Sequence, residues 1–138
     1  MSSLDLERAG TTLLRVSLGL MFIAHSVVLK YFTFTLAGTA QYFESIGLPG
    51  PLAYVVFAAE AIGGVLLVLG IKTRWVALGL IPVLLGATWA HIGNGWVFSN
   101  AGGGWEYPLY LIVISVVVAL QARSTLTYPE PAGHVSRA

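Results

Sequence analysis

Apolar residues are concentrated in four stretches of this chain, and more polar segments separate them. A helix needs about 20 mostly apolar residues to cross the hydrocarbon core of a membrane, and each stretch is close to that length. The stretches cover about 10–31, 51–70, 73–92 and 106–122. This pattern predicts an all-α fold, a four-transmembrane-helix antiparallel bundle.

Two of the connections between these helices are long and differ from the short turn that joins the second helix to the third. Residues 32–50 are aromatic and semi-polar, and we expect a short interfacial helix there, around Thr39–Ile46. Residues 93–105 are rich in Gly and Trp and carry no charge. Both are typical of segments that lie at the level of the lipid headgroups or fold back over a bundle.

The same pattern divides the chain into three parts. Residues 1–9 are expected to form a cytoplasmic segment, residues 10–122 the membrane domain, and residues 123–138 a polar, disordered tail. The first ten residues lack the basic region, short apolar core and cleavage site of a secretory signal. We therefore expect the first apolar helix to be retained.

Composition indicates that lipid is the solvent of this protein. Apolar residues make up 57% of the chain and charged residues only 9%, with a mean hydropathy of +0.81, whereas soluble domains carry about 25% charged residues. A formal net charge of +1 without a basic cluster gives no reason to expect nucleic acid. The absence of cysteine excludes disulfides, thiol catalysis and thiolate metal ligation by this chain.

The distribution of basic residues predicts the orientation of the bundle. In multi-pass membrane proteins, Lys and Arg are enriched in the cytoplasmic loops. Lys30 lies on one side of the predicted membrane, and the other side carries Arg8, Lys72, Arg74, Arg123 and Arg137. We therefore expect an N-in/C-in protein with its two long connections facing outward. Arg15 is expected to extend from the first helix to the cytoplasmic interface, in preference to the alternative of an anion contact.

One carboxylate interrupts the second apolar stretch, "VVFAAEAIGGVLLVLG". An ionisable residue such as Glu60 costs about 2.5–3.5 kcal/mol inside a membrane and usually faces the bundle interior. Gly63 and Gly64 follow it at one helical turn, and small residues there allow another helix to approach closely. Glu60 is therefore predicted to face inward, either as a functional group or as a hydrogen-bonded residue that ties two helices together.

Each of the other three helices also contributes one titratable residue, and all four lie in the outer half of the bundle. Glu60 lies roughly 13 Å below the outer end of the second helix. His25 lies roughly 9 Å below the outer end of the first helix. His91 and Glu106 lie at the outer surface. The antiparallel arrangement allows the four to converge on a polar pocket, although packing explains His25 alone and helix capping explains Glu106 alone.

These residue types are compatible with two kinds of chemistry. Two imidazoles and two carboxylates could bind a metal ion, and the same groups could donate and relay protons at a quinone headgroup. A haem held by His25 and His91 is disfavoured because their depths differ by roughly 9 Å. The sequence has no flavin, nicotinamide or Fe–S motif.

The motifs "RVSLGLMFIAHSVVLKYF", "YFESIGLPGP", "HIGNGW" and "GGGWEYPL" resemble those of the DoxX family, and the resemblance covers about residues 11–122. Family members commonly carry a Lys four residues after the His of the first helix, whereas Lys30 follows His25 by five. Ser26 replaces the Gly that usually follows that His. The family's characteristic polar residues fall on Arg15, His25, Glu60, His91, Asn94 and Glu106.

The resemblance implies a four-helix protein of the bacterial cytoplasmic (inner) membrane that is associated with redox chemistry. Relatives include the small membrane subunit of a thiosulfate:quinone oxidoreductase. From the residues and the resemblance together we expect a quinone-interacting oxidoreductase subunit, in which His25 and Glu60 carry protons. The expected headgroup site consists of His25, Glu60, Trp89, His91, Asn94, Trp105 and Glu106.

Two alternatives remain at this point, a membrane scaffold or small-molecule binder or carrier, and a metal site of the His and Glu residues. Trp89 and Trp105 could contact the bound ligand, or they could anchor the protein at the membrane interface. The expected partners are membrane lipid, a redox protein that supplies electrons, and a second copy of the chain. Gly79 and Gly86 lie seven residues apart on one helix face and could serve internal packing or a dimer seam, of which we favour internal packing.

Overall fold

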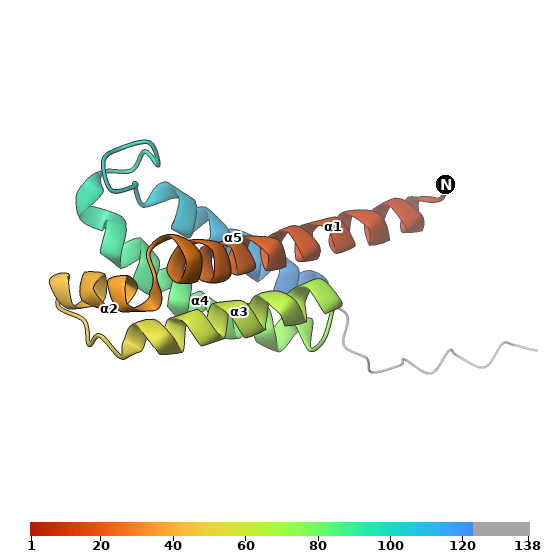
Figure 1. Ribbon diagram of the computed structural model, residues 1–138. Helices are drawn as coiled ribbons and strands as arrows, with labels where there is room; N and C mark the ends of the chain where they lie inside the picture. The colour runs from red at the N-terminus through yellow and green to blue at the C-terminus, as the bar shows by residue number, and fades with distance from the viewer. Residues whose placement is uncertain (123–138) are drawn as a thin grey trace, which may run out of the picture.

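The computed structural model describes residues 1–122, which fold entirely into helices and connecting loops (Figure 1). The expected tail at 123–138 lies outside the described residues. The helices are α1 (Ser3–Ile23), continued by a π-helix η1 (Ala24–Thr33), then α2 (Leu36–Ser45), α3 (Leu52–Leu69), α4 (Thr73–His91), a 3₁₀ turn η2 (Ile92–Asn94) and α5 (Glu106–Gln121). The all-α prediction is confirmed.

Three of these helices are long and apolar enough to cross a membrane: Ser3–Thr33, Leu52–Leu69 and Thr73–Asn94. The fourth predicted span, α5, is apolar but has only 16 residues. The short helix expected near Thr39–Ile46 is present as α2, and it begins three residues earlier than predicted. Large apolar side chains cover the outside of the molecule, with Leu120 77% exposed and Leu13 71% exposed, as lipid-facing surfaces require.

The first helix begins well before the predicted start near residue 10. Ser2 and Asp5 form a capping box, because the Asp5 backbone N–H donates to Ser2 Oγ at 3.2 Å and the Ser2 N–H donates to the Asp5 carboxylate at 3.0 Å. Such a reciprocal pair satisfies the donors that the first turn of a helix leaves unpaired. Capping therefore extends α1 through the polar residues that hydropathy alone assigns to a loop.

The C-terminal part of the first membrane helix changes its hydrogen-bond register. From Ala24 to Thr33 the backbone is a π-helix of 10 residues, in which each N–H bonds to the carbonyl five residues earlier. At its end the Phe34 N–H donates to Leu29 O at 2.8 Å. Long π-helices are rare, and π-helical turns are frequent at functional sites.

Helix α3 packs closely against both α1 and α4. A Cβ atom on Gly64 would lie 2.8 Å from Gly19 O of α1, and one on Gly19 would lie 2.7 Å from Gly64 O. A Cβ on Gly63 would lie 2.9 Å from the side chain of Leu80 in α4. The backbones can approach this closely only because these positions are Gly, so the prediction that this face of α3 is internal is confirmed.

The prediction of internal packing for the other two glycines is wrong, and their role in a dimer seam stays a prediction. Gly79 and Gly86 are both exposed, and a Cβ atom at either would meet no atom within 4 Å. The interior face of α4 is instead formed by larger side chains, of which Leu80 and Leu84 are buried. A spacing of seven residues identifies one helix face, but it does not say whether that face points inward or toward lipid.

Candidate functional site

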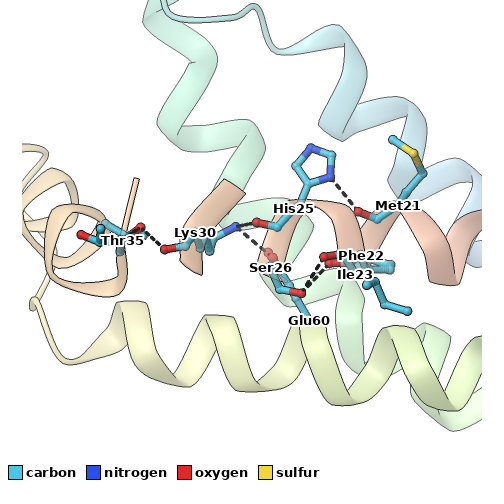
Figure 2. Close-up of polar contacts among 9 residues, drawn as sticks. Met21, Phe22, Ile23, His25, Ser26, Lys30, Thr35 and Glu60 are labelled. Atoms are coloured by element: carbon cyan, nitrogen blue, oxygen red, sulfur yellow. Dashed lines mark hydrogen bonds and ion pairs between the residues drawn. The ribbon is translucent and has the colours of Figure 1, made fainter. Parts of the chain in front are cut away.

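The isolated carboxylate of α3 forms an ion pair with the only basic residue on its side of the predicted bundle. Glu60 Oε2 accepts a hydrogen bond from Lys30 Nζ of η1 at 2.9 Å (Figure 2). The side chain of Glu60 is 8% exposed and that of Lys30 is 18% exposed. Removing one partner of a buried pair leaves the other charge uncompensated, which costs about 3–5 kcal/mol. The pair is therefore a strong constraint on how η1 packs against α3.

The π-helix explains how Lys30 reaches Glu60 in spite of its unusual spacing. In an α-helix, which turns about 100° per residue, Lys30 would point roughly 140° away from His25. In a π-helix the residue five positions along follows one turn later on nearly the same face. Accordingly Lys30 Nζ also lies 3.5 Å from His25 O (Figure 2). The wider register therefore lets Lys30, five residues after His25, extend to Glu60.

His25 is oriented by its own helix, and its bond partner indicates where its proton lies. Its Nδ1 is 2.8 Å from Met21 O (Figure 2). A carbonyl oxygen can only accept, so Nδ1 carries the hydrogen, and Nε2 of the neutral ring is left as an acceptor. No residue within 1–122 binds Nε2. The free nitrogen can therefore accept a proton from a ligand.

An aromatic ring from α5 completes this cluster. Tyr107 stacks on the ring of His25, with ring centroids 5.9 Å apart and an interplanar angle of 25°. Its hydroxyl is buried and has no hydrogen-bond partner within residues 1–122. Buried hydroxyls nearly always find a partner, and leaving one unpaired costs about 1–3 kcal/mol. The hydroxyl is therefore a donor that a bound ligand could use.

The turn that leads from η1 to α2 is fastened to the same region. Thr39 is buried, and its hydroxyl donates to Thr35 O at 2.8 Å and lies 3.4 Å from Lys30 O. Thr35 has φ +62°, which is a costly conformation for a β-branched residue. Its side chain accepts the Gly38 N–H at 3.0 Å and so caps α2. This anchoring fixes the end of η1 from which Lys30 extends.

Three other predicted site residues hold the loop of residues 95–105 over the end of the bundle. His91 Nδ1 lies 3.1 Å from Gly103 O. Asn94 Nδ2 donates to Gly102 O at 3.2 Å and to Gly103 O at 2.9 Å. Glu106 Oε1 accepts the Phe98 N–H at 3.3 Å. These contacts give the three side chains a defined structural role in the loop, and their predicted contact with a ligand stays a prediction.

The four predicted convergent residues thus lie in two clusters. We call His25, Lys30, Glu60 and Tyr107 the proton cluster, and His91, Asn94 and Glu106 the loop cluster. The covalent bond between Glu106 and Tyr107 links them. Across residues 1–122, no three His, Cys, Asp or Glu side chains gather as a group that could hold a metal ion, so the metal alternative gains no support.

The two tryptophans that were predicted to wall the site differ in exposure. Trp89 is 53% exposed, and Trp105 is partly buried at the start of α5. The Trp105 N–H donates to Gly95 O at 3.1 Å and so closes the base of the loop. Their exposure fits the anchoring role, and a ligand role for either ring stays a prediction.

The sequence comparisons identify the family of the chain. The DoxX family model matches residues 10–93, the segment that contains His25, Lys30, Glu60 and His91. The chain belongs to the DoxX family. This DoxX chain is also 47% identical over 111 residues to the Bacillus subtilis (strain 168) protein named "Putative oxidoreductase CatD", covering 80% of this chain and 78% of that protein. No solved structure matches the chain.

Two members of the proton cluster were not predicted. The family spacing left Lys30 without a role, because sequence patterns are interpreted with the α-helical period and not the π-helical one. Tyr107 was overlooked beside Glu106. Charge could have identified Lys30 as the partner of Glu60. A buried carboxylate needs a partner, and Lys30 is the one Lys or Arg on the outer side of the predicted bundle.

Proposed function

We propose that this DoxX protein is a membrane subunit of a quinone-linked oxidoreductase and that a quinone headgroup binds at the proton cluster. The proposal rests on a buried Lys30–Glu60 ion pair whose ammonium also lies 3.5 Å from the His25 backbone carbonyl. It rests equally on the neighbouring His25 ring, which has a free Nε2 and stacks on Tyr107, whose buried hydroxyl is unpaired among the described residues. Ionisable groups inside a membrane protein mark proton and substrate pathways. The oxidoreductase name of the Bacillus subtilis relative supports redox chemistry for this chain.

The donor set fits a quinone. A quinone headgroup presents two carbonyl oxygens on an apolar ring and supplies two-electron chemistry when bound. The Tyr107 hydroxyl needs an acceptor, and Lys30 retains a third ammonium proton beyond those directed at Glu60 and His25 O. The stacked rings of His25 and Tyr107 provide an aromatic edge against which a flat ring can pack.

Each residue of the proton cluster has a distinct proposed role. His25 accepts a proton at Nε2 from a quinol hydroxyl, or returns it when the reaction runs toward the quinol. Lys30 is a point charge that stabilises negative charge on a headgroup oxygen. Glu60 keeps Lys30 in place, and Tyr107 donates a hydrogen bond that orients the headgroup. Trp89, His91, Asn94, Trp105 and Glu106 form the proposed outer mouth.

Electrons must come from elsewhere, because no side chain of this chain is an evident electron carrier. We propose that a partner redox protein delivers them on the outer side of the membrane. In the proposed topology all four helices span the bacterial inner membrane with both termini inside. At 1.5 Å per residue α5 is about 24 Å long, so the spanning segment must include residues next to it.

The test is to purify the full chain from bacterial membranes in a mild detergent and to quantify quinone in its solvent extract. We expect close to one quinone per chain, and a substantial loss in Tyr107→Phe, which removes only the unpaired hydroxyl. Tyr110→Phe is the matched control, because Tyr110 is 61% exposed on the same helix. Absence of quinone from the wild-type protein, or equal quinone in both variants, would refute the proposed site and favour a scaffold or carrier role.

A further inference from the structure

The end of the bundle opposite the proton cluster contains an open cavity of about 1320 Å³. Its walls come from the N-terminal half of α1, the turn between α3 and α4 with the start of α4, and the C-terminal end of α5. One acidic residue lines it, Glu7, together with four basic residues: Arg8, Arg15, Lys72 and Arg74. In a chain with a formal net charge of +1, this concentration of positive charge is local to the cavity.

Two of the four basic side chains are held rigidly by helix C-termini. Arg15 Nη1 donates to Leu67 O at 2.6 Å and to Val68 O at 3.0 Å at the end of α3. Arg74 donates from Nε to Ala119 O at 3.3 Å and from Nη2 to Ala122 O at 2.8 Å at the end of α5. A guanidinium has five N–H donors, so each retains donors for a ligand. Arg15 therefore caps a neighbouring helix from a partly buried position, whereas the sequence favoured an extension to the membrane surface over an anion contact.

The other two basic side chains have no protein partner among the described residues. Neither Arg8 nor Lys72 forms a hydrogen bond or ion pair through its side chain within residues 1–122. Lys72 has φ +48° and precedes α4, whose first turn is not capped by any side chain. The start of a helix carries partial positive charge and unpaired N–H groups, which adds to the positive potential of the cavity.

We propose that this cavity binds the phosphate headgroup of an anionic phospholipid. The guanidinium groups of Arg15 and Arg74 and the unpaired side chains of Arg8 and Lys72 offer charge-assisted hydrogen-bond donors from three sides of the cavity. Only one carboxylate, that of Glu7, lines the cavity beside them. Trp75 lines the same cavity and is 72% exposed, as expected of an aromatic anchor at the headgroup level. Basic pockets between membrane helices on the cytoplasmic side bind anionic headgroups, and the distribution of Lys and Arg assigns this end to the cytoplasm.

The assignment is independent of the proposed redox function, because the two sites lie at opposite ends of the bundle and share no residue. The proposed lipid would contact α1, α4 and α5 around the cavity. Arg15 and Arg74 already donate hydrogen bonds to helix ends there. A lipid bound in this way would order the cytoplasmic end of the bundle.

The experiment is native mass spectrometry of the full chain in a neutral detergent, titrated with phosphatidylglycerol or with phosphatidylcholine of the same acyl chains. We expect at least about tenfold tighter binding of phosphatidylglycerol. The double variant Arg8→Gln/Lys72→Gln should lose about thirtyfold in phosphatidylglycerol affinity, the scale expected for two basic side chains next to an anionic headgroup. Because both side chains are unpaired within residues 1–122, circular dichroism of this variant should match that of the wild type.

Three results would overturn the proposal. Equal binding of the two lipids by the wild-type chain would show that the cavity does not select phosphate charge. An unchanged preference in the double variant would place the lipid elsewhere. The matched charge control is Gln41→Glu/Ser99→Asp, which lowers the net charge by the same two units at exposed positions outside the cavity, and an equal loss in this control would reduce the effect to net charge. Competition by millimolar inorganic phosphate that abolishes phosphatidylglycerol binding would identify free phosphate, and not lipid, as the ligand.

Discussion

The Lys30–Glu60 ion pair provides the strongest quantitative prediction. Its atoms are 2.9 Å apart, which corresponds to a Coulomb attraction of about 6 kcal/mol at an effective dielectric constant of 20. Desolvation of both groups offsets much of this, so the net contribution of the intact pair is small. The loss of one partner is different, because the remaining charge keeps its desolvation cost without the attraction. We expect Lys30→Gln and Glu60→Gln each to lower the free energy of unfolding by about 3 kcal/mol.

The double variant Lys30→Gln/Glu60→Gln separates this explanation from a simple packing effect. With both charges removed no uncompensated charge remains, so the double variant should be no less stable than either single variant. The coupling energy between the two positions should therefore be about 3 kcal/mol. The assay is equilibrium unfolding of the purified chain in mixed micelles of dodecyl maltoside and dodecyl sulfate, followed by far-ultraviolet circular dichroism.

A matched control is available on the surface. Glu44 is exposed, so Glu44→Gln removes the same charge from a carboxylate without a buried partner and should change stability by less than about 0.5 kcal/mol. Single-variant losses below about 1 kcal/mol would refute the reasoning. Losses in the double variant that equal the sum of the two singles would refute it as well, because additive effects mean that the two groups do not interact.

Three further predictions test the fold around the two clusters. Gly64→Ala should destabilise the protein by about 1–3 kcal/mol in the same unfolding assay because its Cβ would meet the α1 backbone at 2.8 Å; Gly79→Ala, which meets nothing, should not. Asn94→Ala removes two hydrogen bonds to the loop, so amide hydrogen exchange at residues 95–105 should accelerate about tenfold. Ser99→Ala is the control, and an equal acceleration in that variant would argue against an anchoring role for Asn94. Ser2→Ala should cost the first turn of α1 about 1 kcal/mol, seen as faster exchange confined to residues 3–9; exchange at the wild-type rate would mean that the cap does not hold this turn.

Much of the fold follows from local properties that a sequence displays directly. The apolar stretches predicted α3, α4 and α5 to within about two residues at each end, because hydropathy, Pro51 at the start of a helix and Gly70 at its end are all properties of neighbouring residues. The inward face of α3 was predictable for the same reason. In an apolar helix, a carboxylate followed one turn later by two glycines is typical of a face that packs against another helix.

The site was only partly predictable, because its partners come from contacts that no local pattern encodes. Glu60 and His25 were identified as candidates, but the partner of Glu60 depends on the π-helical register of η1. Hydropathy has no means of distinguishing an i→i+4 from an i→i+5 bonding pattern within one apolar run. The stacking of Tyr107 on His25 likewise depends on how α5 docks against the first helix.

The sequence by itself therefore determined the class of the protein, its solvent, the positions of its apolar helices and the residue types available for proton chemistry. These follow from composition and periodicity, which act over a few neighbouring residues. The tertiary structure decided which of those residues meet. It separated His91 and Glu106 into a loop cluster and paired Glu60 with Lys30. Burial makes such pairings strong, since a charge taken out of water must find its partner wherever the packing of helices brings one.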